Sequence, residues 1–301
     1  MKHALSVFAA SLVCMNSPAG AEDAPTYPGP QEALDALVGA LSDGSAGGVV
    51  AALGPGVSGL LRPDGDPERA QDWAEMLIAY REGYLFVPLA DGRAEIVLGA
   101  DDWPFPIELV RGDSGWSFDI ESGLDEIAAR EIGLNELDVI DALHAYVEIQ
   151  SAYRQVDHDG DGVMEFASHV ISTEGTRDGL YWPGGDSPIG DLAARASFDG
   201  YADGEGDLDP EPYLGYVFRL LNAQGPAAQG GEMSYMINGN QVAGHALLAV
   251  PADYGVTGVM TFMVGENGRV FEADLGDDTL AVAADITTFD PDERWTETEG
   301  E

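Results

Sequence analysis

Four acidic residues within nine positions are the strongest candidate for chemistry in this sequence. They belong to the segment DHDGDGVME, in which Asp157, Asp159 and Asp161 occupy positions 1, 3 and 5 of a calcium-binding loop. A glycine makes the turn at position 6, Val163 offers its backbone carbonyl at position 7, and Glu165 stands at position 9. Ca²⁺ prefers about six to eight oxygen ligands in a flexible cage. The spacing therefore predicts a calcium site formed by Asp157, Asp159, Asp161, Val163 and Glu165.

Position 12 of this loop departs from a full EF-hand, because Ser168 stands where a bidentate glutamate is expected. The segment is thus an EF-like turn rather than one of a pair of calcium sensors. Two interpretations stay open, a bound ion and an acidic turn without one. The first is favoured because clustered carboxylates repel one another unless a cation lies between them. We expect the ion to be structural rather than catalytic.

Other motifs carry less chemistry. The segment GDSG at residues 112–115 copies the nucleophile motif of trypsin-like proteases, but it lies between two predicted strands, where a hairpin turn is needed. None of the histidines has a helical zinc-binding spacing, and His158 is expected to face solvent. The aromatic segments 178–183 and 213–218 could line a ligand or sugar pocket, although alternation in the second favours a half-buried strand. No catalytic residue is assigned.

The N-terminus has the features of a secretory signal peptide over residues 1–21. A basic start precedes an apolar stretch over residues 4–13 and the small residues Ala19, Gly20 and Ala21. The stretch is shorter than the roughly 20 residues that span a bilayer, so no membrane span is expected. Cleavage after Ala21 would remove Cys14, the single cysteine, and leave a periplasmic or secreted protein that forms no disulfide.

The charge of the chain limits its partners. Fifty-four acidic residues against 13 basic ones give a formal net charge of −41. Such a charge repels phosphate backbones and anionic lipid, so neither nucleic acid nor a membrane surface is expected as a partner. A protein or another envelope component remains possible as a partner.

The hydrophobic pattern predicts an α+β fold in two parts. A flexible leader over residues 22–30 precedes an N-terminal domain over residues 31–123. This domain has helices starting near Gln31 and Pro67, followed by strands at 84–88, 93–98, 107–110 and 116–120. The order of elements resembles the NTF2-like architecture.

The second part, residues 134–295, is predicted to pack one long helix on an antiparallel sheet. The helix runs over 135–155 with Asn135 as its cap, and strands follow at 213–221, 234–237, 245–250, 258–264 and 269–273. Asn267 and Gly268 form a hairpin turn with positive φ at both positions. This order weakly resembles the globular part of type IV pilin-like proteins. The helix is internal and amphipathic, however, which argues against pilin-like filament assembly.

Several segments together resemble one family of exported bacterial proteins, the domain of unknown function 2950 (DUF2950). They occur in order along residues 31–295: GADDWPFPIELV, DHDGDGVMEFA, DGLYWP, GYVFRLLNAQGPAA, PADYGVTGVMTFMV and DLGDDT. The resemblance implies export and a shared fold, and it supplies no reaction.

The sequence therefore favours an exported, non-enzymatic protein with a structural Ca²⁺ ion and a role in binding a partner or surface. Two alternatives remain. One is a hydrolase or carbohydrate-active enzyme that uses a cleft of carboxylates and aromatic residues. The other is an envelope or pilus-like assembly factor.

Overall fold

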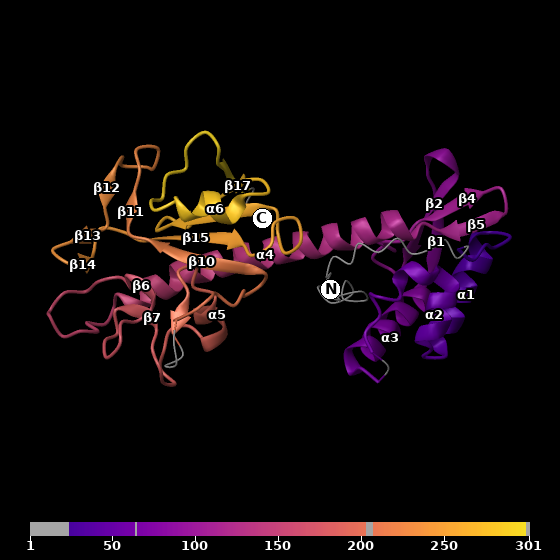
Figure 1. Ribbon diagram of the computed structural model, residues 1–301, viewed down its shortest axis with the longest axis horizontal. Coiled ribbons are helices and arrows are strands. Elements are labelled where there is room, and N and C mark those ends of the chain that lie inside the picture. Colours follow the sequence, from indigo (N-terminus) through magenta and orange to yellow (C-terminus); the bar gives the residue numbers. More distant parts are fainter. Residues whose placement is uncertain (1–23, 64, 203–206, 299–301) are drawn as a thin grey trace. The chain divides into compact units, whose positions relative to one another are not determined.

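The computed structural model describes residues 24–63, 65–202 and 207–298, and it divides into two compact units (Figure 1). The N-terminal unit ends at Glu131 and the C-terminal unit begins at Ile132. Both contain helices and antiparallel sheets, which confirms the α+β class. The predicted signal peptide over residues 1–21 lies outside the described residues.

The N-terminal unit packs helices on one five-stranded antiparallel sheet. Its strand order is β1-β2-β4-β5, with β3 paired to β2. The helical elements are α1 (Pro30–Ser42), α2 (Ala46–Leu53), η2 (Pro55–Val57), α3 (Pro67–Glu82) and η3 (Ala90–Gly92). The strands are β1 (Tyr84–Pro88), β2 (Arg93–Leu98), β3 (Trp103–Pro104), β4 (Leu109–Gly112) and β5 (Gly115–Phe118).

Local signals explain most of these boundaries. Helix α3 begins at Pro67 because the Asp66 side chain accepts hydrogen bonds from the backbone N–H groups of Glu68 and Arg69. Strands β1 and β2 match the predicted ranges. Helix α2 was not expected from the sequence, although Ser45 marks its start by accepting a hydrogen bond from the Gly48 N–H at 2.9 Å.

The core of this unit is a single apolar cluster between the helices and the sheet. Leu34 and Leu37 of α1 lie in it with Ile96 and Leu98 of β2. The predicted flexible leader is wrong at Tyr27, whose backbone forms two hydrogen bonds with Trp116 of β5. The segment around Tyr27 is therefore fixed to the edge of the sheet.

Helix α4 (Ile120–Tyr153) starts much earlier than predicted. Asn135 is therefore not its cap but lies inside it. The side-chain amide of Asn135 donates instead to the Thr257 carbonyl at 2.9 Å. Glu136, the next residue, accepts hydrogen bonds from the backbone N–H groups of Val259 and Met260. These tertiary contacts occupy the polar groups that resemble a helix start in the sequence.

The C-terminal unit is built around the five-stranded antiparallel sheet β10-β15-β16-β17-β18. Its strands are β10 (Tyr216–Leu221), β15 (Ala246–Pro251), β16 (Met260–Gly265), β17 (Val270–Asp274) and β18 (Thr296–Glu297). Short strands form four two-stranded pairs: β6 (His169–Ile171) with β7 (Gly179–Tyr181), β8 (Tyr201–Ala202) with β9 (Asp207–Leu208), β11 (Ala223–Gln224) with β12 (Met233–Ser234), and β13 (Met236–Ile237) with β14 (Asn240–Gln241). The short helices are α5 (Asp191–Arg195) and α6 (Thr279–Ala284).

Both faces of this sheet are covered. Leu247 of β15 lies in one apolar cluster with Leu143 and Tyr146 of α4. Leu248 points to the opposite face, where it joins a second cluster with Ala283 of α6. Figure 1 shows α6 beside β15, and every residue of that strand is buried. The predicted helix-on-sheet packing is thus one half of a three-layer arrangement, because α6 and the following segment cover the other face.

The hairpin between β16 and β17 is where the sequence predicted it, but its turn type differs. The Gly268 N–H donates to the Gly265 carbonyl at 3.0 Å, and Gly268 has a φ of 75°. Asn267 does not have positive φ, and its side chain accepts a hydrogen bond from the Arg269 N–H. A longer loop with a single left-handed glycine therefore replaces the predicted two-residue turn.

Candidate functional site

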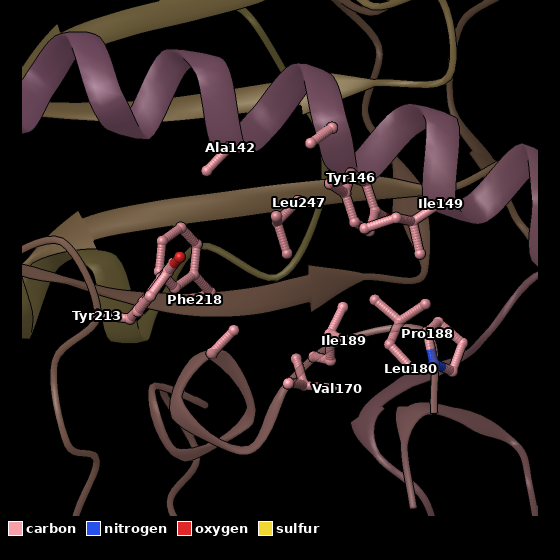
Figure 2. Close-up of a pocket in the computed structure, with 13 residues that line it drawn as sticks. Ala142, Tyr146, Ile149, Val170, Leu180, Pro188, Ile189, Tyr213, Phe218 and Leu247 are labelled. Atoms are coloured by element: carbon pink, nitrogen blue, oxygen red, sulfur yellow. The ribbon is translucent and has the colours of Figure 1, made fainter. Parts of the chain in front are cut away.

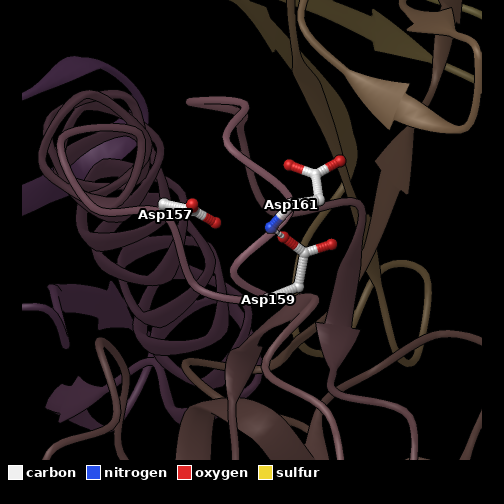
Figure 3. Close-up of side chains that lie close together, drawn as sticks. All are labelled: Asp157, Asp159 and Asp161. Carbon is white, nitrogen blue, oxygen red and sulfur yellow. Dashed lines mark hydrogen bonds between the residues drawn. The ribbon is translucent and has the colours of Figure 1, made fainter.

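The acidic loop, residues 157–165, follows α4 and brings three predicted ligands together. One carboxylate oxygen from each of Asp157, Asp159 and Asp161 lies within 4.8 Å of one from each of the others. Figure 3 shows the three side chains around one turn. Asp157 is half-buried, while Asp159 and Asp161 are exposed. The cluster is therefore open to solvent on one side.

Hydrogen bonds to the backbone hold this turn. Asp157 accepts from the N–H groups of Gly160 and Gly162 at 2.7 and 2.9 Å. Asp159 accepts from Asp161 at 3.2 Å, and Asp161 accepts from Val163 at 2.7 Å. Side-chain turns of this kind are a local property of aspartate, which explains why the loop can be recognised from its sequence.

The other predicted ligands lie differently. Val163 belongs to the turn through its N–H group. Glu165 is not part of the three-carboxylate cluster, because its side chain accepts a hydrogen bond from the Gln241 N–H of β14 at 3.1 Å. Ser168, at position 12, donates instead to the Asp178 carbonyl at 3.3 Å. Within the described residues, the cluster thus contains three of the four acids that the spacing suggested.

The acids of the loop differ in their electrostatics. Hydrogen bonds from the N–H groups of Gly162 and Gly160 lower the pKa of Asp157. Burial raises the pKa of Glu165, and the carboxylates of Asp159 and Asp161 raise it further. A cation in the loop would oppose this repulsion by favouring the ionised forms.

Contacts with its surroundings fix the loop in place. Asn240 of β14 donates to Asp161 at 2.7 Å, and the Phe166 N–H donates to the Gln241 carbonyl at 2.8 Å. The expectation that His158 faces solvent is wrong, because its half-buried ring stacks on Tyr153 with 4.0 Å between the ring centroids. The loop is therefore joined to both α4 and β14.

The donor set fits a hard cation such as Ca²⁺. Oxygens on opposite sides of one Ca²⁺ ion are about 5 Å apart, because each lies about 2.3–2.6 Å from the metal. The three aspartate oxygens lie within 4.8 Å of one another, so one ion can reach all three. Each carboxylate has further lone pairs beyond those that accept the N–H groups.

A second feature of the C-terminal unit is an apolar pocket of about 300 Å³. In Figure 2 helix α4 forms one wall, the segment with Leu180 and Ile189 lies opposite, and strands carrying Phe218 and Leu247 form the floor. The lining residues are Ala142, Ala145, Tyr146, Ile149, Val170, Leu180, Pro188, Ile189, Gly190, Ala193, Tyr213, Phe218 and Leu247. Both aromatic segments singled out in the sequence contribute to it, whereas the α4 wall and residues 188–193 were missed.

The remaining motifs do not form a catalytic arrangement in the described residues. Residues 112–115 form the turn of the β4–β5 hairpin, as expected. Burial raises the pKa of several carboxylates, and none of them lines the apolar pocket or the shallower pocket beside Tyr254: Asp72, Glu131, Glu165 and Glu272. Raised carboxylate pKa values and pocket walls therefore occur in different places.

No helix among the described residues is long and apolar enough to cross a membrane. Comparison with curated proteins and with solved structures gives no significant match. The NTF2-like and pilin-like resemblances therefore have no support from a solved structure. One family model, described as a protein of unknown function (DUF2950), matches residues 24–298. This match covers nearly the whole chain, and the chain belongs to the DUF2950 family.

Proposed function

We propose that this chain is an exported, non-enzymatic protein whose acidic loop binds a structural Ca²⁺ ion. The observation that carries the proposal is the convergence of Asp157, Asp159 and Asp161 on one turn. Asp157, Asp159 and Asp161 supply carboxylate oxygens, Val163 supplies its carbonyl, and Glu165 contributes from the periphery through water. The ion links the end of α4 to β14, because the loop contacts both elements.

The carboxylates whose pKa is raised by burial lie away from the pocket walls, which supports a non-enzymatic role. The shallower pocket beside Tyr254 does contain acids, namely Asp253, Asp277 and Asp278. A hydrolase acting through carboxylates needs an acid with a raised pKa beside its substrate. In the apolar pocket, the lining residues contain no acidic side chain. The protein acts instead by binding a partner or an envelope component, and its net charge of −41 argues against nucleic acid as that partner.

Export is the second part of the proposal, and it rests on residues 1–21. Mass spectrometry of the protein recovered from the extracytoplasmic fraction is expected to give Glu22 as the first residue. Recovery of the intact chain from the cytoplasm would contradict export.

Calcium binding is tested by thermal unfolding in EGTA and in millimolar Ca²⁺. A ligand that binds only the folded state raises the free energy of unfolding, by about 2.7 kcal/mol when its free concentration is 100 times Kd. The melting temperature rises with it. A higher melting temperature in Ca²⁺ than in EGTA is expected for the wild type. Asp159→Ala should lose this difference, because it removes a ligand oxygen that Asn at the same position would still supply.

Two controls separate a specific ion from general screening of a very acidic chain. Asp277→Ala removes an exposed carboxylate of the same unit outside the loop, and it should keep the calcium response. Mg²⁺ at equal concentration should stabilise less, because it demands a smaller octahedral site. A calcium site would be contradicted if Ca²⁺ raised the melting temperature equally in the wild type, the loop variant and the control variant. It would also be contradicted if Mg²⁺ stabilised the wild type as much as Ca²⁺.

A further inference from the structure

The apolar pocket of the C-terminal unit has the size and wall chemistry of a binding site for a small molecule. Pockets that bind small ligands begin at about 300 Å³ and are mostly apolar with few polar groups. Its volume of about 300 Å³ is roughly twice that of a cavity that holds one benzene ring, so it accommodates about a dozen carbon atoms.

The lining residues of the pocket differ in solvent exposure. Val170, Leu180 and Leu247 are buried, whereas Ala145 and Gly190 are exposed. The exposed pair marks the mouth, and the buried residues form the inner surface. An apolar ligand that enters through the mouth would bury its own surface and the apolar floor away from water, and this burial favours binding.

Polar atoms are scarce in these walls. Among the 13 lining residues, only Tyr146 and Tyr213 have polar side-chain atoms. The Tyr146 hydroxyl is already used, since it donates to the Ala246 carbonyl and accepts from the Gln150 amide, each at 3.2 Å. The Tyr213 hydroxyl has no hydrogen-bond partner among the residues that the structure describes. One neutral hydrogen-bonding group is therefore available to a ligand.

Charge further restricts the ligand. No lining residue can neutralise a charged headgroup, and burying an unpaired charge is costly. Three acids adjoin lining positions in the sequence: Asp141, Glu148 and Asp191, of which Asp191 is paired with Arg195 at 2.7 Å. Together with the net charge of −41, they disfavour an anion.

We propose that this pocket binds an uncharged, mainly apolar molecule of about a dozen heavy atoms, such as a medium-chain alcohol, with its neutral polar group at Tyr213. The pocket discriminates against the corresponding carboxylate. This inference goes beyond the calcium proposal, and no lining residue belongs to the acidic loop.

The test uses the full-length protein and the neutral fluorophore 1-aminonaphthalene, whose roughly 11 heavy atoms match the pocket, displaced in turn by 1-decanol and by decanoate at pH 8. Decanol is expected to displace the fluorophore with a Kd on the order of 10 μM, and decanoate at least tenfold more weakly. This comparison needs no variant. Equal displacement by the two ligands, or no binding of the fluorophore, would overturn the proposal.

Variants locate the site. Ala142→Phe fills the pocket from α4 and Ala193→Phe fills it from α5, so each should reduce fluorophore binding at least tenfold. Leu192→Phe is the matched control, because Leu192 is 70% exposed and does not line the pocket. If the Phe variants fold poorly, Ala142→Leu and Ala193→Leu replace them. These smaller side chains should give an intermediate loss of fluorophore affinity. Unchanged binding in the filled variants would refute the assignment.

Tyr213→Phe tests the polar contact alone. It should weaken decanol three- to tenfold and leave the fluorophore affinity unchanged, because only the alcohol loses a partner for its hydroxyl. Unchanged decanol affinity would contradict the role of Tyr213.

Discussion

The two units differ in how their sheets are buried. The N-terminal unit has one apolar cluster, and only Arg69 and Asp72 are buried polar side chains among its described residues. The C-terminal unit has a cluster on each face of its sheet and seven buried polar residues: Gln150, Ser197, Gln224, Gln241, His245, Thr261 and Thr279. The acidic loop and the apolar pocket both belong to this second unit.

This difference indicates where specificity resides. An apolar core tolerates many arrangements of similar volume, whereas buried polar groups need particular partners. In the C-terminal unit some of these groups lack a partner among the described residues, including His245 Nδ1 and both side-chain amide atoms of Gln241. Such groups lower stability. Asp72 Oδ2 and Trp103 Nε1 show that the N-terminal unit has them as well, so among the described residues the C-terminal unit differs in having more of them and in having them beside the candidate sites.

The largest expected effect comes from the same core substitution in both units. Leu98 of β2 and Leu248 of β15 are each 0% exposed, so replacement by Ala should cost about 3 kcal/mol in either case. Calorimetry should show that each variant lowers a different unfolding transition. A single transition, lowered equally by both variants, would show that the units unfold together.

Acidification should affect the C-terminal unit selectively. Burial lowers the pKa of His245 to about 4, and the nearby Arg154 contributes in the same direction. Since the unfolded pKa is about 6.5, the unfolded state gains a proton first as the pH falls. The His245 contribution to stability should therefore be constant above about pH 6.5, fall by at most about 3 kcal/mol between pH 6.5 and 4, and then level off.

Denaturant titrations from pH 8 to pH 4 measure this loss. The comparison is with His245→Gln, which should start less stable but lose less stability on acidification. The ring contacts of His245 with Tyr146 and Phe166 explain the lower starting point. Parallel pH curves for the two proteins would contradict the assignment to His245.

A backbone substitution tests the edge of the N-terminal sheet. A Cβ on Gly115 would lie 2.4 Å from the Tyr27 carbonyl oxygen, and Gly115 has a φ of 133°. Gly115→Ala should therefore cost about 2 kcal/mol through strain and loss of the Tyr27 pairing. Gly112→Ala is the control on the same hairpin, since its Cβ would meet no atom nearer than 3.9 Å. Similar melting temperatures for both variants would refute the close approach.

The smallest effect concerns one hydrogen bond of Tyr27. Its hydroxyl donates to the Ala52 carbonyl at 2.8 Å in a partly buried place, so Tyr27→Phe should cost about 1 kcal/mol. Tyr84→Phe removes an exposed bond to Gln31 and should change stability less. Urea titration measures both. A larger loss for Tyr84→Phe would reverse the order that burial predicts.

Local chemistry made part of the molecule predictable. Strands β1 and β2 follow from short runs rich in apolar residues, and α3 follows from Pro67 at its first turn. The acidic loop was also visible, because aspartates at alternate positions form their hydrogen bonds within a few residues of themselves. For such features the sequence contains nearly all the interacting groups.

Features that depend on distant partners were missed. Asn135 looks like a cap until Thr257 is known to accept its amide hydrogen. Glu165 has the spacing of a direct metal ligand, yet the N–H of Gln241 holds its carboxylate outside the three-carboxylate cluster, where only the water-mediated role proposed above is open to it. The apolar pocket likewise requires α4, the 188–193 segment and two strands to meet, and no local pattern encodes that meeting.

Helix α4 also has a consequence for biosynthesis. Its apolar stripe, with Leu143 and Tyr146, is translated well before β15, β16 and β17, which carry Leu247, Phe262 and Val270 of the same cluster. At about 5–20 residues per second, the ribosome needs on the order of ten seconds to supply these strands. During that interval the stripe is an exposed apolar surface that can associate with other apolar surfaces. A nascent chain of this kind is a natural client for a chaperone that shields exposed apolar helices until the remainder of the polypeptide arrives.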